Sequence, residues 1–189
     1  TGALEPTNEA YAIAKISAIK LCRYYNQQYS TDFLSLMPTN LYGPNDNYDL
    51  ENSHVLAAFI RKFHEAKQSG KSVVLWGDGS PRREFLHSYD LAEAIIFLLE
   101  NKNASDIGEI INVGTGADIT IRELAELVAS IIGYTGEVVW DTTKPNGTPQ
   151  KLLDVSRIMN MGWMPKMELK MGIMNAYADF LLRYENSCR

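Results

Sequence analysis

Hydrophobic positions along the chain recur with two different periods. Spacings of three and four residues, which bring side chains to one side of a helix, predict helices over 8–29, 53–69, 89–101, 120–132 and 168–185. Short runs of β-branched and other apolar residues predict strands over 32–37, 72–76, 109–114 and 137–141. Segments rich in Gly, Pro, Asn and Asp separate these elements. Strands that alternate with helices favour an α/β fold with parallel strands.

The first predicted helix is apolar on two sides. Tyr11, Ala18 and Tyr25 mark one face, and Ile13 and Ile16 mark another. We therefore expect one face to pack on a sheet and the other on a partner subunit, as in a homodimer. Thr7 or Asn8 is expected to cap this helix, and Asp118 or Thr120 the fourth.

Composition narrows the class of protein. Hydrophobic residues make up 46% of the 189 and charged residues 22%, which is ordinary for a globular domain. The net charge of -5 argues against a nucleic-acid-binding surface. No apolar run is long enough for a membrane span, and no signal-peptide pattern opens the chain. Cys22 and Cys188 match no metal or redox spacing, so we expect no metal site and a reducing, cytoplasmic setting.

A tyrosine and a lysine stand one helical turn apart at the start of the chain. Tyr11 and Lys15 project to the same side of the predicted helix. An ammonium close to a phenol stabilises the phenolate, which allows proton exchange with a substrate oxygen. A carbonyl reductase needs this chemistry. Because the chain has 10 tyrosines, the spacing also arises by chance, and a purely structural role stays open at this point.

Several further segments accompany the Tyr-x-x-x-Lys spacing. They read "MPTNLYGPND" (37–46), "ENSH" (51–54), "WGDGSPRREFLH" (76–87) and "KPNGTPQKLLD" (144–154). Together they resemble the extended short-chain dehydrogenase/reductase family of nucleotide-sugar enzymes, over essentially the whole chain. The Tyr-x-x-x-Lys spacing and "REFLH" are shared widely in this family, whereas "PTNLYGPND" with "ENSH" and "KPNGTPQKLLD" are most similar to the members that both epimerise and reduce a GDP-linked 4-keto sugar. The resemblance implies a Rossmann-type fold with a smaller α/β substrate domain, NADPH as cofactor and a GDP-sugar substrate.

The resemblance also implies roles for the acid–base residues and the cofactor contacts. Tyr11 would protonate the C4 oxygen of the sugar, and Lys15 would hold the nicotinamide ribose. The strip Pro38, Thr39, Asn40 and Leu41 would line the nicotinamide. His54 would contact the cofactor and serve as the acid in epimerisation at C3 and C5. Without the resemblance, His54 reads as a residue beside a helix N-cap with no chemistry.

A second group would bind the nucleotide and sugar. By resemblance, Arg83 would grip the diphosphate, Trp76 would pack near the sugar or nucleotide, and Lys151 would reach the nucleotide. Lys62 stands where the family often has arginine, and Asn146 stands where aspartate is common, which leaves both roles open. The residues alone also allow structural roles, in which Trp76 is a core tryptophan and the lysines and Arg83 are solvated surface charges.

Other candidates are assigned structural roles. His64 is expected at the surface, and His87 is expected to fix the end of a strand. Cys22 reads as a small packing residue, and "GTGAD" (114–118) lacks the glycine fingerprint of a phosphate loop.

The glycine-rich turn that opens a dinucleotide-binding domain does not occur in this sequence. Because the chain also starts at Thr1, we expect it to be the later part of a longer protein. We assign 1–37 and 88–116 to the cofactor domain, and 38–87 and 117–189 to the substrate domain. Two other functions stay open: another nucleotide-sugar epimerase, dehydratase or reductase, and a sugar-nucleotide-binding module without catalysis.

Overall fold

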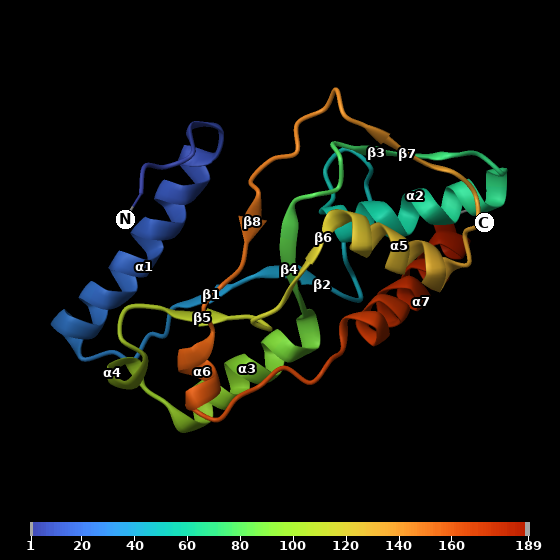
Figure 1. The fold of residues 1–189 in the computed structure, drawn as a ribbon. Coiled ribbons are helices and arrows are strands. Elements are labelled where there is room, and N and C mark those ends of the chain that lie inside the picture. Colours follow the sequence, from blue (N-terminus) through green and yellow to red (C-terminus); the bar gives the residue numbers. More distant parts are fainter. Residues whose placement is uncertain (1, 188–189) are drawn as a thin grey trace.

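The structure is a computed structural model that describes residues 2–187, so Cys188 lies outside the described residues. Its helices are α1 (Glu9–Tyr29), α2 (Val55–Ser69), α3 (Ser88–Asn101), α4 (Ala104–Ile107), α5 (Ile121–Ile132), α6 (Ser156–Asn160) and α7 (Leu169–Ser187), with a short 3-10 helix at Pro6–Asn8 (Figure 1). Its strands are β1 (Leu36–Pro38), β2 (Asn40–Tyr42), β3 (Val73–Trp76), β4 (Arg82–His87), β5 (Ile111–Val113), β6 (Asp118–Thr120), β7 (Val138–Asp141) and β8 (Gln150–Lys151). All five helices predicted from the sequence are confirmed.

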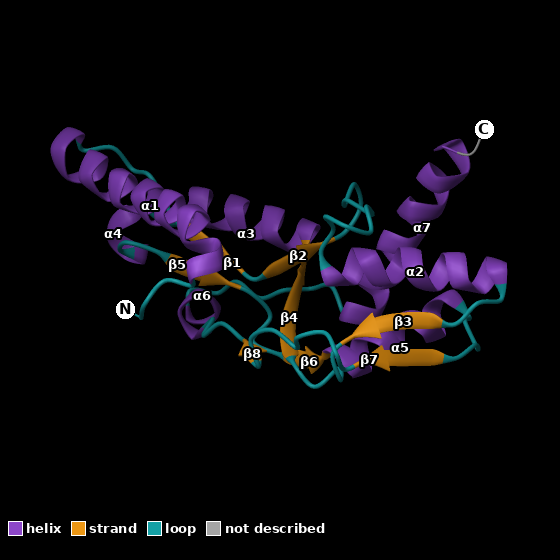
Figure 2. Cartoon of the chain, turned by 90° about the horizontal axis from the view of Figure 1, so that it is seen from above, coloured by secondary structure: helices purple, strands orange, loops and turns teal. Residues whose placement is uncertain are grey.

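The strands form mostly parallel pairs, as the alternation of strands and helices predicts. β1 pairs with β5, β2 with β4, β3 with β7 and β8 with β4, all in parallel. β6 is the exception, because it runs antiparallel to β4. Seen from above, β3 and β7 run side by side next to α2 and α5 (Figure 2). The α/β fold is therefore confirmed.

The chain changes partner strand at Thr39. Residues 36–38 pair with β5, and residues 40–42 pair with β4. Between them, the Thr39 amide donates to the Val113 carbonyl (3.1 Å) and its hydroxyl donates to the Glu84 carbonyl (3.3 Å). Ligands in open α/β sheets bind where neighbouring strands diverge in this way. The strip predicted to line the nicotinamide spans this switch.

The strand predicted over 32–37 is shorter in the structure. Residues 32–35 are irregular, and the Asn26 side chain binds both backbone groups of Phe33, because its Oδ1 accepts from the amide (2.8 Å) and its Nδ2 donates to the carbonyl (2.9 Å). β4 was missed because its sequence, "RREFLH", begins with charged residues that break the apolar alternation. β2 lies between Pro38 and the turn at Gly43, which hides it among turn signals.

The predicted caps are confirmed for only one helix. Thr120 and Glu123 form a reciprocal capping box at the start of α5. Asn8 occupies the N-cap position of α1, but its side chain makes no capping hydrogen bond within the described residues.

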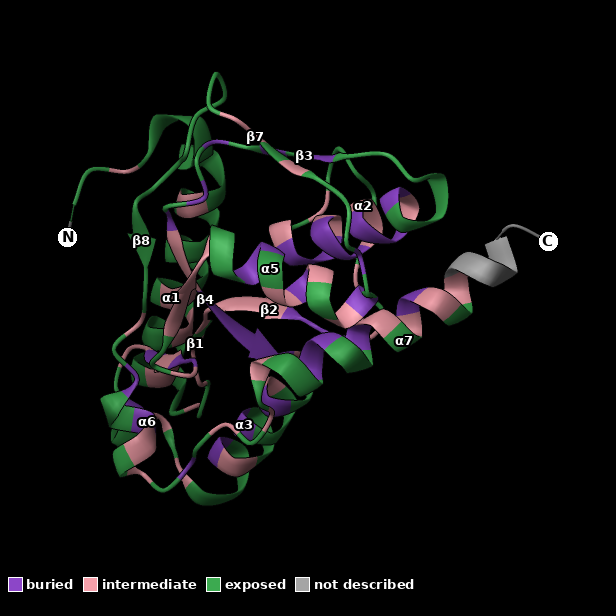
Figure 3. Ribbon diagram, turned by 45° about the vertical axis from the view of Figure 1, so that its right-hand side comes forward, coloured by how far each residue is buried: buried purple, intermediate pink, exposed green. Residues whose placement is uncertain are grey.

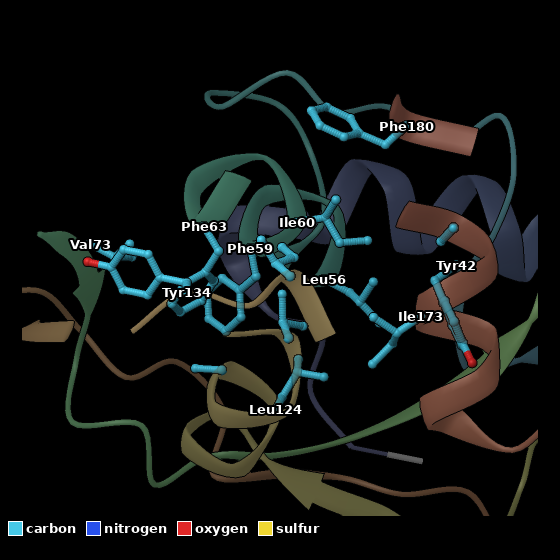
Figure 4. Packing of buried hydrophobic residues seen from close by; sticks show 14 of the residues in the cluster. Tyr42, Leu56, Phe59, Ile60, Phe63, Val73, Leu124, Tyr134, Ile173 and Phe180 are labelled. Carbon is cyan, nitrogen blue, oxygen red and sulfur yellow. The ribbon is translucent and has the colours of Figure 1, made fainter. Parts of the chain in front are cut away.

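Two hydrophobic clusters hold the fold together. The larger joins α2, α5 and α7, which all carry buried residues (Figure 3). Its aromatic side chains include Phe59, Phe63 and Tyr134 (Figure 4). The smaller joins α3, β5 and α6 and includes Val155, Ile158 and Trp163. The division into two domains stays a prediction. Residues 153–163 were assigned to the substrate domain, but they pack with α3 and β5, which were assigned to the cofactor domain.

Helix α1 is largely exposed within this chain. None of its residues is buried, and Tyr11, Ile13, Leu21, Tyr24 and Tyr29 expose about half or more of their surface. Its ribbon lies at the edge of the molecule, away from α2, α5 and α7 (Figure 1). The half-buried Cys22 is on this helix. Within residues 2–187, no helix combines the length and hydrophobicity that crossing a membrane requires.

His64 contradicts the prediction that it lies at the surface. It is 6% exposed, because it projects from the apolar face of α2, and its Nδ1 lies 3.0 Å from the Tyr177 hydroxyl of α7. His87 confirms the structural role predicted for it. It ends β4, and its Nδ1 accepts from the Tyr89 amide at the start of α3 (3.2 Å).

Replacing His64 by glutamine is expected to weaken the dependence of stability on acid pH. Burial lowers the pKa of His64 in the folded protein, so the unfolded chain takes up a proton first as the pH falls. The wild type should therefore lose stability as the pH falls from about 6.5, the ordinary histidine value, towards the lower folded pKa. Urea unfolding of both proteins between neutral and acid pH measures this loss, and equal pH dependence in the two would contradict the prediction.

Candidate active site

Tyr11 and Lys15 project together from the first turns of α1. The Lys15 Nζ lies 5.3 Å from the centroid of the Tyr11 ring, so the predicted pair is on one side of the helix. Tyr11 is 61% exposed and is accessible to a ligand. The ammonium lies near the Tyr11 ring in a cation–π arrangement.

One cavity collects Tyr11, His54 and the predicted nicotinamide-lining strip, whereas Lys15 is not among its lining residues. It has a volume of about 580 Å³ and lies between the start of α1, the β1–β2 switch and the segment that follows β8. Its lining includes Tyr11, the whole strip Pro38–Leu41, His54 and Lys151. These residues are far apart in the sequence, and the parallel strands bring them to the same place. We call this space the reaction cavity.

His54 lies at the N-cap position of α2, where the sequence alone left a structural role open. Its side chain makes no capping bond to the described residues of the helix and instead lines the reaction cavity together with Tyr11. Its imidazole is exposed and is available for proton transfer to a bound molecule.

A second cavity, of about 340 Å³, holds the residues predicted to contact the nucleotide or sugar. Its lining includes Lys62, Trp76, Arg83 and Asn146. The segment 51–55 contributes to both spaces, because Ser53 faces the second cavity and His54 the reaction cavity. We call this second space the nucleotide cavity.

Two cations on neighbouring strands line different cavities, Lys151 the reaction cavity and Arg83 the nucleotide cavity. Arg83 and Lys151 are in register on the parallel strands β4 and β8. Arg83 uses one N–H to bond the Arg82 carbonyl (2.7 Å), and a guanidinium carries five such donors. Burial lowers the pKa of Arg83 and also that of Lys62, which means that both cations have lost part of their hydration. Such positions favour an anionic ligand that restores charge balance.

The remaining wall of the nucleotide cavity comes from two neighbouring loops. Trp76 ends β3 with its side chain 66% exposed, and the Lys144 Nζ lies 5.8 Å from the centroid of its ring. The Asn146 Oδ1 accepts from the Asp78 amide (2.9 Å), so this residue ties the loop after β7 to the loop after β3. Trp76 is thus a surface aromatic beside a cavity, and the core role considered for it from the sequence is wrong.

Some residues around these cavities escaped the sequence analysis. Leu152 and Leu153 line the reaction cavity, although they read only as apolar residues of the "KLLD" run. Glu84 binds the loop 114–116, and its Oε1 accepts from the Thr115 and Gly116 amides (2.6 and 2.8 Å). These bonds agree with the prediction that "GTGAD" is no phosphate loop, because its amides already bind a carboxylate. The available signal was an acidic residue directly before the apolar residues Phe85 and Leu86 of β4.

Comparison with known proteins identifies relatives of the chain. Residues 1–114 match the NAD dependent epimerase/dehydratase family. The chain is 56% identical over 178 residues to "Probable GDP-L-fucose synthase 1" of Oryza sativa subsp. japonica, covering 94% of this chain and 53% of the relative. It is 53% identical over 187 residues to the GDP-L-fucose synthase of Escherichia coli (strain K12), covering 95% and 58%.

A solved structure shows the same fold. The GDP-L-fucose synthetase of Naegleria fowleri bound to NADP superimposes with a TM-score of 0.90 at 30% identity, over 97% of this chain and 59% of that one. The chain thus spans little more than half the length of these relatives. Since the family match covers well over half of its residues, the chain belongs to the NAD dependent epimerase/dehydratase family.

Proposed function

We propose that the protein containing this chain converts GDP-4-keto-6-deoxymannose to GDP-L-fucose with NADPH, by epimerisation at C3 and C5 and reduction at C4. The observation that carries the proposal is the reaction cavity, in which a tyrosine with an adjacent lysine faces the same space as an accessible histidine. Relatives named GDP-L-fucose synthase support the choice of sugar.

The residues present fit the nicotinamide end of the cofactor. The strip Pro38–Leu41 offers an apolar and amide surface for a flat ring. Lys15 lies outside that lining but beside the Tyr11 ring, and its ammonium is proposed to donate to a ribose hydroxyl. NADPH, when bound, supplies the hydride that reduces C4. The chain's own residues orient the sugar and move protons.

In epimerisation, protons are exchanged at the carbons on either side of the ketone. Their removal is feasible because the resulting enolate carries its charge on the C4 oxygen. A base elsewhere in the full-length protein is proposed to take the proton from carbon, and His54 is proposed to give a proton back to carbon, since a protonated imidazole is an N–H donor. In reduction, the Tyr11 hydroxyl is proposed to give its proton to the C4 oxygen. The Lys15 ammonium then stabilises the phenolate that remains.

The GDP part of the substrate is proposed to occupy the nucleotide cavity. Arg83 and Lys151, side by side on neighbouring strands, supply the positive charge that a diphosphate needs. Trp76 offers an exposed aromatic surface beside them, and Lys62 adds a second cation to the wall. A lysine at this position provides charge without the two-pronged geometry of arginine.

The test of this function is an assay of the full-length protein with GDP-4-keto-6-deoxymannose and NADPH, read as loss of NADPH and formation of GDP-L-fucose. Turnover of a different nucleotide sugar alone would favour the neighbouring activities of the family. GDP binding without turnover of any 4-keto sugar would favour a non-catalytic binding module.

We also propose that the full-length protein is a cytoplasmic homodimer that uses α1 in its interface. Apolar residues on two sides of α1, such as Tyr11 and Ile13, support this, because one side can pack on a sheet and the other on a second copy of the chain. Sedimentation at micromolar concentration should give the dimer mass, and Leu21→Glu should shift the protein towards the monomer. A monomeric wild type would contradict the proposal.

A further inference from the structure

A carboxylate that the proposed chemistry does not use lies beneath the reaction cavity. Glu84, in β4, is completely buried at 0% exposure. An isolated buried charge is costly, so its partners reveal what it holds in place. Its Oε1 accepts from the amides of Thr115 and Gly116, and its Oε2 accepts from the amide of Leu153 (3.0 Å). The carboxylate is thus satisfied by backbone donors from two separate segments.

One of these segments forms a wall of the reaction cavity. Lys151, Leu152 and Leu153 all line it, and the strand β8 that leads into them has only two residues, Gln150 and Lys151. So short a strand fixes the chain weakly. The bond from the Leu153 amide to Glu84 holds the segment where regular pairing has ended. Lys151 owes its place beside Arg83 to the pairing of β8 with β4 and to this bond.

The opposite wall is held by the backbone of the same residue. The Glu84 carbonyl accepts from the Asn40 side chain (2.7 Å) and from the Thr39 hydroxyl (3.3 Å). Both donors belong to the strip Pro38–Leu41. Glu84 therefore bonds one wall through its main chain and the other through its side chain.

The close approach of the loop 114–116 is built into the sequence as well. A Cβ added at Gly114 would collide with the Glu84 carboxylate. A side chain at this position would push the loop off its acceptor, so glycine is required here for proximity rather than for backbone angle.

We propose that Glu84 is a positioning residue for nucleotide binding: its buried carboxylate sets Lys151–Leu153 against the strip Pro38–Leu41. The inference rests on the proposed function, because it assumes that Lys151 contacts the GDP part of the substrate. Glu84 touches no substrate itself and acts through the segments that it bonds.

The test compares Glu84→Gln with a matched variant in the full-length protein. The amide has nearly the same shape as the carboxylate but turns one acceptor into a donor, which opposes the Leu153 or the loop amides. The Glu84 main-chain carbonyl, and therefore the strip Pro38–Leu41, is unaffected. Calorimetric titration should show a rise of about tenfold in the Kd for GDP, equivalent to about 1.4 kcal/mol, with the Kd for NADPH changed by less than about twofold.

Asp90→Asn is the matched control. Asp90 is also buried (4% exposed), and its carboxylate accepts from the amides of Lys166 and Met167 (3.1 and 3.0 Å), which do not line the reaction cavity. We expect this variant to lose thermal stability as Glu84→Gln does, with GDP affinity unchanged. If Glu84→Gln does not fold, Glu84→Asp, which keeps the charge but shortens the reach, takes its place with the same expected split.

Three results would overturn the proposal: unchanged GDP affinity in the Glu84 variant, equal weakening of GDP and NADPH, or equal weakening of GDP in Asp90→Asn. The first two mean that the carboxylate does not act on GDP binding through Lys151, and the third means that the effect is one of general stability. Because binding is measured without turnover, a wild type that binds GDP but converts no sugar would refute the proposed reaction and leave this comparison valid.

Discussion

Replacing Tyr11 by phenylalanine in the full-length protein is expected to abolish reduction at C4 and to leave epimerisation intact. The phenol is the proposed proton donor to the C4 oxygen, and loss of such a group lowers a rate by about 100- to 10,000-fold. The ring itself stays, so the shape of the reaction cavity is preserved. Oxidation of NADPH measures reduction, and deuterium uptake from solvent at C3 and C5 measures epimerisation.

Tyr24→Phe is the control for this experiment. Tyr24 is on the same helix and is also exposed, but it lies outside the lining of the reaction cavity. The loss of a phenol there should leave both rates near those of the wild type. If Tyr11→Phe slowed deuterium uptake as much as NADPH oxidation, the tyrosine would not be specific to the reduction step.

Replacing His54 by asparagine should have the opposite pattern. The imidazole is the proposed proton donor to carbon, and asparagine keeps hydrogen-bonding capacity but cannot exchange a proton near neutral pH. We expect deuterium uptake at C3 and C5 to fall by about 100-fold or more. Because the His54 side chain makes no capping bond to the described residues of α2, the substitution should leave the stability of the helix almost unchanged.

His64→Gln is the control for His54→Asn, because it removes a histidine that does not line the reaction cavity. His64 lies ten residues further along α2 in the hydrophobic core, away from the reaction cavity. The His64→Gln variant should lower the free energy of unfolding without selectively slowing deuterium uptake. Undiminished uptake in His54→Asn would refute the role of His54, whatever happened to reduction.

The two variants together test whether one cavity performs both steps. Tyr11 and His54 come from different elements, the start of α1 and the start of α2, but both face the same 580 Å³ space. A sugar bound there would be within reach of both groups without leaving the site. The expected result is that each variant stops one step and leaves the other measurable, so the product of the first step accumulates in Tyr11→Phe.

The sequence by itself determined the helices and the character of the fold. Helices that bury one face show their period directly, because each apolar residue follows the last by three or four positions. It also determined that Tyr11 and Lys15 lie close together, since residues four positions apart on a helix project to the same side. Local interactions settle such features.

The sequence failed where distant segments decide the outcome. β4 begins with charged residues, and Glu84 is buried only because amides from 115–116 and 153 reach it from other parts of the chain. His64 was predicted to lie at the surface because its partner, the Tyr177 hydroxyl of α7, is more than a hundred residues away in the sequence.

The tertiary structure alone decided how the site is assembled. The gathering of Tyr11, His54 and Lys151 around one space depends on strand pairings between residues that are more than forty positions apart. The sequence contains the groups that carry the chemistry, but side-chain periodicity reports only which face of its own element a residue occupies. Distances between elements are fixed by packing and by long-range hydrogen bonds, which no local pattern of residues specifies.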